Sequence, residues 1–166
     1  MYLLDANVFI QAKNEHYGFD FCPGFWDWID QANGERRAFS ITQVLDELRA
    51  GEDALADWAH QRRDRLFVAP DDPVIDSLRA LSQWANAGRY EQTGVSAFLQ
   101  AADYYLVAHA HAHDMTVVTH EVPSDSTRKI KIPDACIGMG VSFMRTPTML
   151  RSEKVRLVLA DGRGAA

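Results

Sequence analysis

The sequence predicts an α/β fold in which helices cover both faces of a mainly parallel β-sheet. Short apolar runs alternate with longer helical segments along the 166 residues, which is the pattern of strand–helix units. The chain is 47% hydrophobic and 10% aromatic, which is enough for one compact core. We therefore predict a single domain over residues 1–160, followed by a flexible tail at residues 161–166.

The first half of the chain supplies three predicted strands with helices between them. The strands are expected at residues 2–5, 38–41 and 66–70, and helices are expected from about residues 6, 23, 40 and 53. The second helix has Pro23 near its start and stops at Gly34. The third should start at Ser40, because SITQ has the Ser-x-x-Gln form of a capping box.

The second half repeats the alternation. A helix is expected at residues 72–87, with a proline in its first turn and a glycine after its end. One long helix should run from about Ser96 to His113, followed by the β-rich run MTVVTHE from Met115. VSFM and VRLVLA, in the last thirty residues, predict one or two edge strands.

Acidic residues follow two of the predicted strands. In a parallel α/β sheet the binding crevice lies at the carboxyl ends of the strands. Asp5 ends the first strand, and Glu121 closes the THE that follows strand TVV. Both carboxylates should therefore lie at the same edge of the sheet.

Two further acids fall on apolar helix faces. In the predicted helix from Ser96, Asp103 lies about 40° from Leu99 at 100° per residue, so it shares the apolar face. In the helix from Ser40, Glu47 lies beside Val44, while Asp46 points nearer to solvent. A lone ionised carboxylate on a buried face costs several kcal/mol, on the order of a broken buried ion pair.

Together these four carboxylates predict a cation site. Acids gathered in one cleft repel one another unless some are protonated or a cation neutralises them. Hard ions such as Mg²⁺ or Mn²⁺ prefer oxygen ligands. The ordinary alternatives are a helix N-cap for Asp5, a buried ion pair for Glu47 or Asp103, and a surface loop position for Glu121.

The motifs LLDANVFI, VLDEL, AADYYLVAHA and VVTHE, in this order and spacing, resemble those of the PIN-domain ribonucleases, which include the VapC-type toxins of toxin–antitoxin operons. The aromatic residues 19–28 and the run KIKIPDAC at residues 129–136 are typical of a less-studied branch of that family. The resemblance extends from residue 2 to about residue 140.

This resemblance implies a three-layer α/β/α sandwich and a set of site residues. Catalytic and metal-binding roles would fall to Asp5, Glu47, Asp103 and Glu121, with Asn7 and Thr119 supporting them. The family more often has Asp at the last acidic position, so Asp125 is the alternative to Glu121.

The activity implied by the resemblance is metal-dependent hydrolysis of RNA phosphodiester bonds, with Mg²⁺ or Mn²⁺ as cofactor. The partners would be the RNA substrate, a protein antitoxin and a second copy of the chain. The alternative is a PIN-fold binding module without catalytic activity. A phosphotransferase of the haloacid-dehalogenase type is excluded, because it needs a second acid two residues after the first, where this chain has Asn7.

The charge distribution supports an RNA partner despite a net charge of -6. Residues 1–125 hold nine Lys/Arg against 20 Asp/Glu, whereas residues 126–166 hold eight against three. Arg128, Lys129 and Lys131 could hold the RNA backbone, or they could be ordinary solvated charges. With neither a long apolar run nor a signal-like start, we expect a cytoplasmic protein and no membrane partner.

Two other clusters have alternative interpretations. His109 and His113, four residues apart on a helix, could bind a transition metal with His120, or be ordinary helix residues. The aromatic side chains of residues 19–28 could pack in the core, or form a groove for a partner such as an antitoxin.

Overall fold

A computed structural model describes residues 1–158 and contains a five-stranded sheet in which every pairing is parallel. The order is β3-β2-β1-β4-β5. The strands are β1 (Tyr2–Leu4), β2 (Ala38–Ile41), β3 (Phe67–Val68), β4 (Thr116–Val118) and β5 (Phe143–Met144). Strand β1 is central, and its Leu3 pairs with Phe39 on one side and Val117 on the other.

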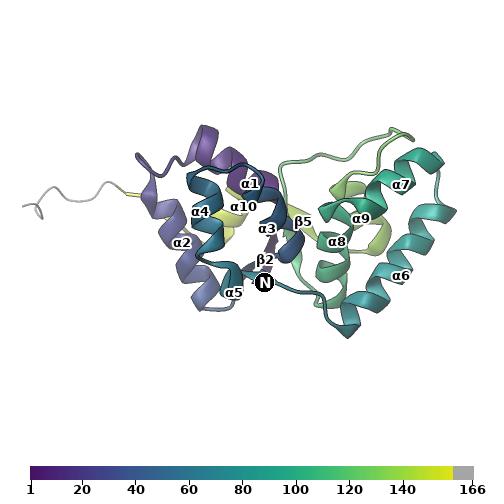
Figure 1. Cartoon of the computed structure of the whole chain (residues 1–166), viewed down its shortest axis with the longest axis horizontal. Helices are drawn as coiled ribbons and strands as arrows, with labels where there is room; N and C mark the ends of the chain where they lie inside the picture. Colours follow the sequence, from purple (N-terminus) through teal and green to yellow (C-terminus); the bar gives the residue numbers. More distant parts are fainter. Residues whose placement is uncertain (159–166) are drawn as a thin grey trace, which may run out of the picture.

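Helices lie on both sides of the sheet, with α2, α4 and α10 on one side and α6, α7, α8 and α9 on the other (Figure 1). The helices are α1 (Ala6–Gln11), the π-helix η1 (Ala12–His16), α2 (Pro23–Gly34), α3 (Thr42–Arg49), α4 (Ala54–His60), α5 (Arg63–Leu66), α6 (Asp72–Ala87), α7 (Gln92–Gln100), α8 (Ala102–Ala112), α9 (Ile132–Met139) and α10 (Thr146–Ser152). The predicted α/β/α sandwich is confirmed. No helix among residues 1–158 is sufficiently long and apolar to cross a membrane.

The centre of the sheet forms the core. Leu3, Leu4, Val117 and Val118 are fully buried, because β1 and β4 have neighbouring strands at both edges and helices on both faces. Burial of one such side chain contributes about 1.5–3 kcal/mol. The core therefore fixes the position of the loops that leave β1 and β4.

The long helix predicted from Ser96 to His113 is wrong in one respect. The backbone is extended at Ala101 (φ -86°, ψ 157°), and this residue separates α7 from α8. Apolar residues continue at helical spacing on both sides of the break, so periodicity could not locate it. Asp103 consequently lies in the first turn of α8, and its angle from Leu99 has no structural meaning.

The predicted capping box at Ser40 is also wrong. Ser40 lies in β2 and is fully buried, and its hydroxyl donates a hydrogen bond to the Leu4 carbonyl at 2.7 Å. Ile41 is the N-cap of α3 and makes no side-chain capping bond. The tertiary hydrogen bond across β1 and β2 has displaced the local one.

The end of the chain differs from the prediction as well. VSFM does form part of an edge strand, β5, but residues 155–158 of the run VRLVLA have no regular structure. Residues 159 and 160, and the predicted tail at 161–166, lie outside the described residues.

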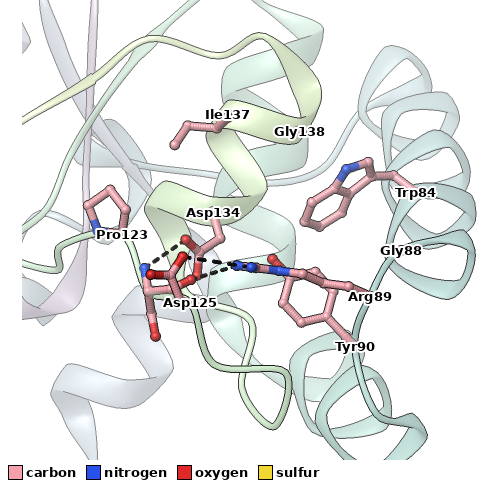
Figure 2. A pocket seen from close by; sticks show the side chains of 10 residues that line it. Trp84, Gly88, Arg89, Tyr90, Pro123, Asp125, Asp134, Ile137 and Gly138 are labelled. Carbon is pink, nitrogen blue, oxygen red and sulfur yellow. Dashed lines mark hydrogen bonds and ion pairs between the residues drawn. The ribbon is translucent and has the colours of Figure 1, made fainter.

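Helix α9, which we did not predict, is anchored against the end of α6 (Figure 2). Gly138 lies so close to Trp84 that a Cβ atom on residue 138 would come within 2.1 Å of the indole ring. The Asp134 carboxylate accepts hydrogen bonds from the backbone N–H groups of Ser124 (2.9 Å) and Lys131 (3.3 Å). Asp134 thereby ties the loop after β4 to the first turn of α9.

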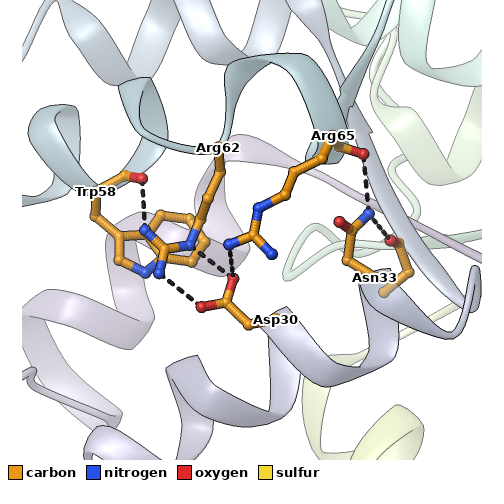
Figure 3. A network of polar contacts seen from close by, with 6 residues as sticks. Asp30, Asn33, Trp58, Arg62 and Arg65 are labelled. Carbon is orange, nitrogen blue, oxygen red and sulfur yellow. Dashed lines mark hydrogen bonds and ion pairs between the residues drawn. The ribbon is translucent and has the colours of Figure 1, made fainter.

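A polar network holds α2 against α4 and α5 on the other side of the sheet (Figure 3). Asp30 accepts two hydrogen bonds from Arg62, at 2.7 and 2.6 Å, and one from Arg65 at 2.8 Å. The Arg62 guanidinium lies over the Trp58 ring, 4.3 Å from its centroid. Asn33 donates to the carbonyls of Ala38 and Arg65. Three elements therefore share one set of charge-assisted bonds.

Candidate active site

Asp5 lies at the carboxyl end of the central strand and is 3% exposed. Its Oδ2 accepts hydrogen bonds from the Thr119 hydroxyl (2.8 Å) and the Asn7 amide (3.4 Å). The side chain makes no capping bond with α1, so the N-cap alternative does not explain it. Burial raises the pKa of Asp5 to about 6, opposed by the Thr119 hydrogen bond and reinforced by the charge of Glu121.

Thr119 joins the two central strands at this edge. Besides donating to Asp5, its hydroxyl oxygen accepts a hydrogen bond from the Glu121 backbone N–H at 3.1 Å. Thr119 is 1% exposed, so both bonds are shielded from water. Thr119 and Asn7 thus hold the Asp5 carboxylate in one orientation, and their supporting role in a metal site stays a prediction.

Asp103 lies in the first turn of α8 and is half-buried. Burial raises its pKa to about 7, and the charges of Asp5 and Glu121 add to this, whereas Lys129 opposes it. The positive end of the α8 dipole favours the ionised form, but not enough to outweigh these effects. The charges of the acids at the ends of β1 and β4 thus act on Asp103.

Glu47 lies at the rim of the site and not on a buried face. It is exposed, as is Asp46 beside it in α3. The prediction that Glu47 points into the interior is therefore wrong, because Val44 and Leu48 fill the buried face of α3 while Glu47 beside them stays exposed. Partial loss of water contact and then the charge of Asp103 raise the pKa of Glu47, which places it within electrostatic range of the cluster.

Glu121, the residue that departs from the family pattern, makes two different contacts. Its Oε2 accepts a hydrogen bond from the Ile132 N–H at 2.9 Å, at the start of α9, and its Oε1 lies 3.6 Å from the Lys129 ammonium. The longer side chain of Glu allows it to reach α9 from the end of β4. Asp125 is exposed and pairs with Arg89 at 3.8 Å. Glu121, and not Asp125, therefore contributes to the field at Asp5 and Asp103.

Two small hollows flank the acids. One, of about 170 Å³, is lined by Glu47, Ile10 and Lys13 among others. The other, of about 210 Å³, is lined by Asp103, Phe98, Arg128 and Lys129 among others.

The residues are chemically suited to a hard divalent cation. All four acids offer oxygen ligands, and burial together with neighbouring carboxylates raises the pKa values of Asp5 and Asp103, so a bound cation would favour their ionised forms. Within residues 1–158, however, no three Asp, Glu, His or Cys side chains lie close enough together to enclose an ion.

The basic residues differ in how they relate to the site. Arg128 and Lys129 are exposed, and Arg128 lies 3.6 Å from Glu91. Lys129 lines the hollow beside Asp103, whereas Lys131 is half-buried at the start of α9. Arg128 and Lys129 are thus the better placed for an RNA backbone.

Two of the three histidines lie together, since the ring centroids of His109 and His113 are 6.4 Å apart. His109 is buried with Nδ1 3.1 Å from the Tyr105 carbonyl, and His113 lies 3.1 Å from Asp71. His120 follows the carboxyl end of β4, and its Nε2 lies 3.1 Å from the Thr146 hydroxyl instead. The set predicted as a transition-metal alternative is therefore not assembled.

The aromatic stretch at residues 19–28 belongs mainly to the core. Phe25, Trp26 and Trp28 are buried, and Phe19 stacks on Trp26 with ring centroids 4.2 Å apart. Phe21 is 66% exposed. Four of these five aromatic side chains thus pack in or against the core, and Phe21 remains accessible to solvent.

Sequence reasoning missed Asp134, which is 8% exposed and caps α9 beside Glu121. Pro133 in the first turn of α9 and Gly140 after its end were the available signals for that helix. Asp134 lies in the first turn of α9 and accepts hydrogen bonds from the Ser124 and Lys131 N–H groups. It therefore holds the loop that carries Glu121 against α9.

Comparisons with solved structures show a shared fold. The chain resembles FitAcB from Neisseria gonorrhoeae, with 19% identity and a TM-score of 0.53 over 86% of this chain and 96% of that one. FitAB bound to the IR36 DNA fragment is 18% identical, with a TM-score of 0.53 over 87% of this chain and 94% of that one. VapBC2 from Rickettsia felis bound to a DNA fragment from their promoter is 16% identical, with a TM-score of 0.53 over 87% of this chain and 97% of that one. The expected resemblance to VapC-type PIN domains is confirmed at the level of the fold.

Sequence comparison gives a single assignment. No curated protein matches the chain. Residues 2–157 match a protein family described as a domain of unknown function, DUF4411. This match includes all four candidate acids and both supporting residues, and on this basis the chain belongs to the DUF4411 family.

Proposed function

We propose that this chain is a metal-dependent endoribonuclease, the toxin of a bacterial toxin–antitoxin pair. The observation that carries the proposal is the buried Asp5 carboxylate at the carboxyl end of β1, held by Thr119 and Asn7 beside the end of β4. The charge of Glu121 raises the pKa of Asp5, and the charges of Asp5 and Glu121 raise that of Asp103. A structural role would favour paired acids, because unpaired buried carboxylates lower stability. The cluster therefore supports a functional role.

Each residue has a distinct task in this proposal. Asp5 and Asp103, with Glu47 and Glu121, would hold Mg²⁺ or Mn²⁺, and such an ion supplies the positive charge that acidifies water and neutralises a phosphodiester in hydrolysis. Thr119 and Asn7 keep Asp5 oriented. Lys129 and Arg128 bind the phosphate backbone. Attack by water leaves a 5'-phosphate on the 3'-side product, because the ribose 2'-hydroxyl takes no part.

The similar structures support a protein antitoxin as partner. They are FitAB and VapBC2, each bound to a DNA fragment. A chain with the same fold has a suitable scaffold for an equivalent partner. The site edge and the exposed Phe21 are the surfaces on which we place the antitoxin, and a second copy of this chain is a further proposed partner.

The test is RNA cleavage by the purified chain, free of partners, in Mn²⁺, Mg²⁺ or EDTA. Asp103→Asn is the site variant, and Asp46→Asn, which removes an exposed carboxylate next to Glu47, is the matched control. We expect metal-dependent cutting of mixed cellular RNA by wild type and Asp46→Asn only. Cutting that persists in Asp103→Asn or in EDTA would contradict the proposal. Absence of both cutting and Mn²⁺ binding would identify a binding module instead.

A further inference from the structure

A pocket of about 600 Å³ lies outside the acid cluster. It is formed by the end of α6, the connection from α6 to α7, the loop after β4 and α9 (Figure 2). Trp84 and Tyr90 form one wall, with ring centroids 5.7 Å apart and planes at 58°. Ile137, which is 62% exposed, lies at the α9 side. Aromatic faces of this kind are stacking surfaces for nucleobases.

The polar groups of the pocket are arranged so that one carboxylate remains available. Arg89 donates a hydrogen bond to the Ser124 carbonyl at 2.8 Å, and its guanidinium lies 5.6 Å from the centroid of Tyr90. Both oxygens of Asp134 already accept backbone N–H bonds. Asp125 is fully exposed, and its ion pair with Arg89 is long at 3.8 Å. The oxygens of Asp125 can therefore accept hydrogen bonds from a ligand.

The pocket and the acid cluster share one loop. Glu121 begins this loop at the metal-binding acids, Asp125 lies in its middle at the pocket, and Lys129 near its end lines the hollow beside Asp103. The loop is held down at Gly94, where a Cβ atom would come within 2.5 Å of the Arg128 carbonyl. A strand that crosses the acids could thus place a neighbouring base in the pocket.

Charge separates the two parts of a nucleotide here. The pocket contains two carboxylates and one guanidinium, which disfavours a phosphate inside it. Arg128 and Lys129 lie outside it on the same loop and suit the phosphates. A base, and not a phosphate, therefore fits the pocket.

We propose that this pocket binds a guanine of the RNA substrate next to the cleaved bond, an inference that rests on the proposed function. The base would stack on Tyr90, with the tilted Trp84 ring at its edge, and Asp125 would accept hydrogen bonds from its N1–H and N2–H groups. Only guanine among the four bases presents two adjacent donors that match the two oxygens of a carboxylate. Adenine and cytosine place an acceptor beside their amino group, and uracil has one donor between two acceptors.

The test uses fluorescently labelled single-stranded octanucleotides with the full chain in EDTA, so that metal-dependent cutting does not interfere. The oligonucleotides differ at one position, which is guanine, inosine or adenine, and inosine lacks only the N2 amino group. We expect the guanine RNA to bind about tenfold more tightly than the other two. In Asp125→Asn that ratio should fall to about one, because an amide offers a single acceptor.

Asp76→Asn is the matched control, since it removes an exposed acid from α6 and so corrects for the general effect of charge on RNA affinity. It should keep the guanine preference. Equal binding of guanine and inosine RNA by wild type, or an unchanged ratio in Asp125→Asn, would overturn the proposal, and a peptide would then be the better occupant.

The two proposals can fail separately. Guanine preference without cleavage in any metal would leave the base pocket standing and refute the nuclease. Metal-dependent cleavage without base preference would do the reverse. Quenching of tryptophan fluorescence by guanosine, lost in Trp84→Phe, gives a second readout that requires no phosphodiester, because contact of the base with the indole is itself measured.

Discussion

The carboxyl group of Asp5 is nearly inaccessible to water, yet no cation is paired with it among the described residues. Its pKa of about 6 compares with 3.8 for an ordinary Asp. The unfolded chain therefore ionises at lower pH than the folded one, so this residue lowers stability as pH rises. The full loss corresponds to about 3 kcal/mol.

A pH prediction follows for the metal-free chain in EDTA. The destabilisation due to Asp5 is absent below pH 4, develops between pH 4 and 6, and is complete above pH 6. In Asp5→Asn the free energy of unfolding should decline less over this interval than in wild type. Urea denaturation at pH 4.5 and 7 measures the difference, and parallel pH profiles for the two proteins would contradict it.

A second prediction concerns metal addition at pH 7. Mn²⁺ should raise the free energy of unfolding of wild type by about 2.7 kcal/mol at 100 times its dissociation constant, because it binds only the folded site. Asp103→Asn should lose most of this gain, whereas the control Asp46→Asn should keep it. Thermal melts with and without Mn²⁺ provide the measurement. An equal gain in all three proteins would place the metal elsewhere.

At the scale of elements, the start of α9 is held by Glu121, which lies eleven residues before it. The Glu121 carboxylate accepts a hydrogen bond from the Ile132 N–H. Glu121→Gln retains an acceptor at this position, whereas Glu121→Asp is too short to reach. We expect Glu121→Asp to lower the free energy of unfolding by about 1 kcal/mol and Glu121→Gln to lower it less. Both should weaken Mn²⁺ binding. Equal stabilities in urea would show that the hydrogen bond contributes little.

The contact between α2 and α5 gives an independent prediction about stability. Asp30 bonds Arg62 and Arg65 (Figure 3), and Arg62 is only 15% exposed. Asp30→Ala should cost about 1–3 kcal/mol, because two guanidinium groups lose a partner. Asp27→Ala, on an exposed position of the same helix, is the control. Cleavage of RNA per folded molecule should be unchanged in both.

Elements with local signals could be predicted, and those decided by tertiary contacts could not. Pro23 and Gly34 bound α2 as predicted, since proline and glycine act on their own backbone. Ser40 failed as a cap because its hydroxyl bonds Leu4, which is distant in sequence. The break at Ala101 failed because both flanking helices keep apolar spacing.

For the candidate site, strand ends were the reliable part. Asp5 and Glu121 follow buried strands, and parallel pairing brings them to one edge. The position of Glu47 was less predictable, because helical periodicity places it beside the buried Val44 and Leu48 but does not say where the buried face of α3 ends. No sequence pattern predicted the pocket between α6 and α9, since Trp84 and Asp125 come together only in the folded chain.

At the scale of the whole molecule, the basic side chain of Lys129 lies beside the candidate acids at one edge of the sheet. RNA binding should therefore depend on salt, and Lys129→Ala should reduce the slope of log affinity against log salt by about 0.7, the value for one single-strand phosphate contact. Arg63→Ala, on an exposed part of α5 away from the site, should leave the slope unchanged. Affinity measured between 50 and 200 mM salt, concentrations on the scale at which such slopes are resolved, tests this. Equal slopes for wild type and Lys129→Ala would show that Lys129 makes no contact with the RNA backbone.

The central position of β1 has a consequence for synthesis on the ribosome. This strand is made before β4, but Asp5 meets Thr119 across 114 positions of sequence. β1 cannot pair with β4 until residues 116–118 have left the exit tunnel, and such distant pairing forms slowly. A nascent chain that ends before β4 therefore lacks the assembled acids, so the ribosome that makes this protein is exposed to the complete site only after β4 has emerged.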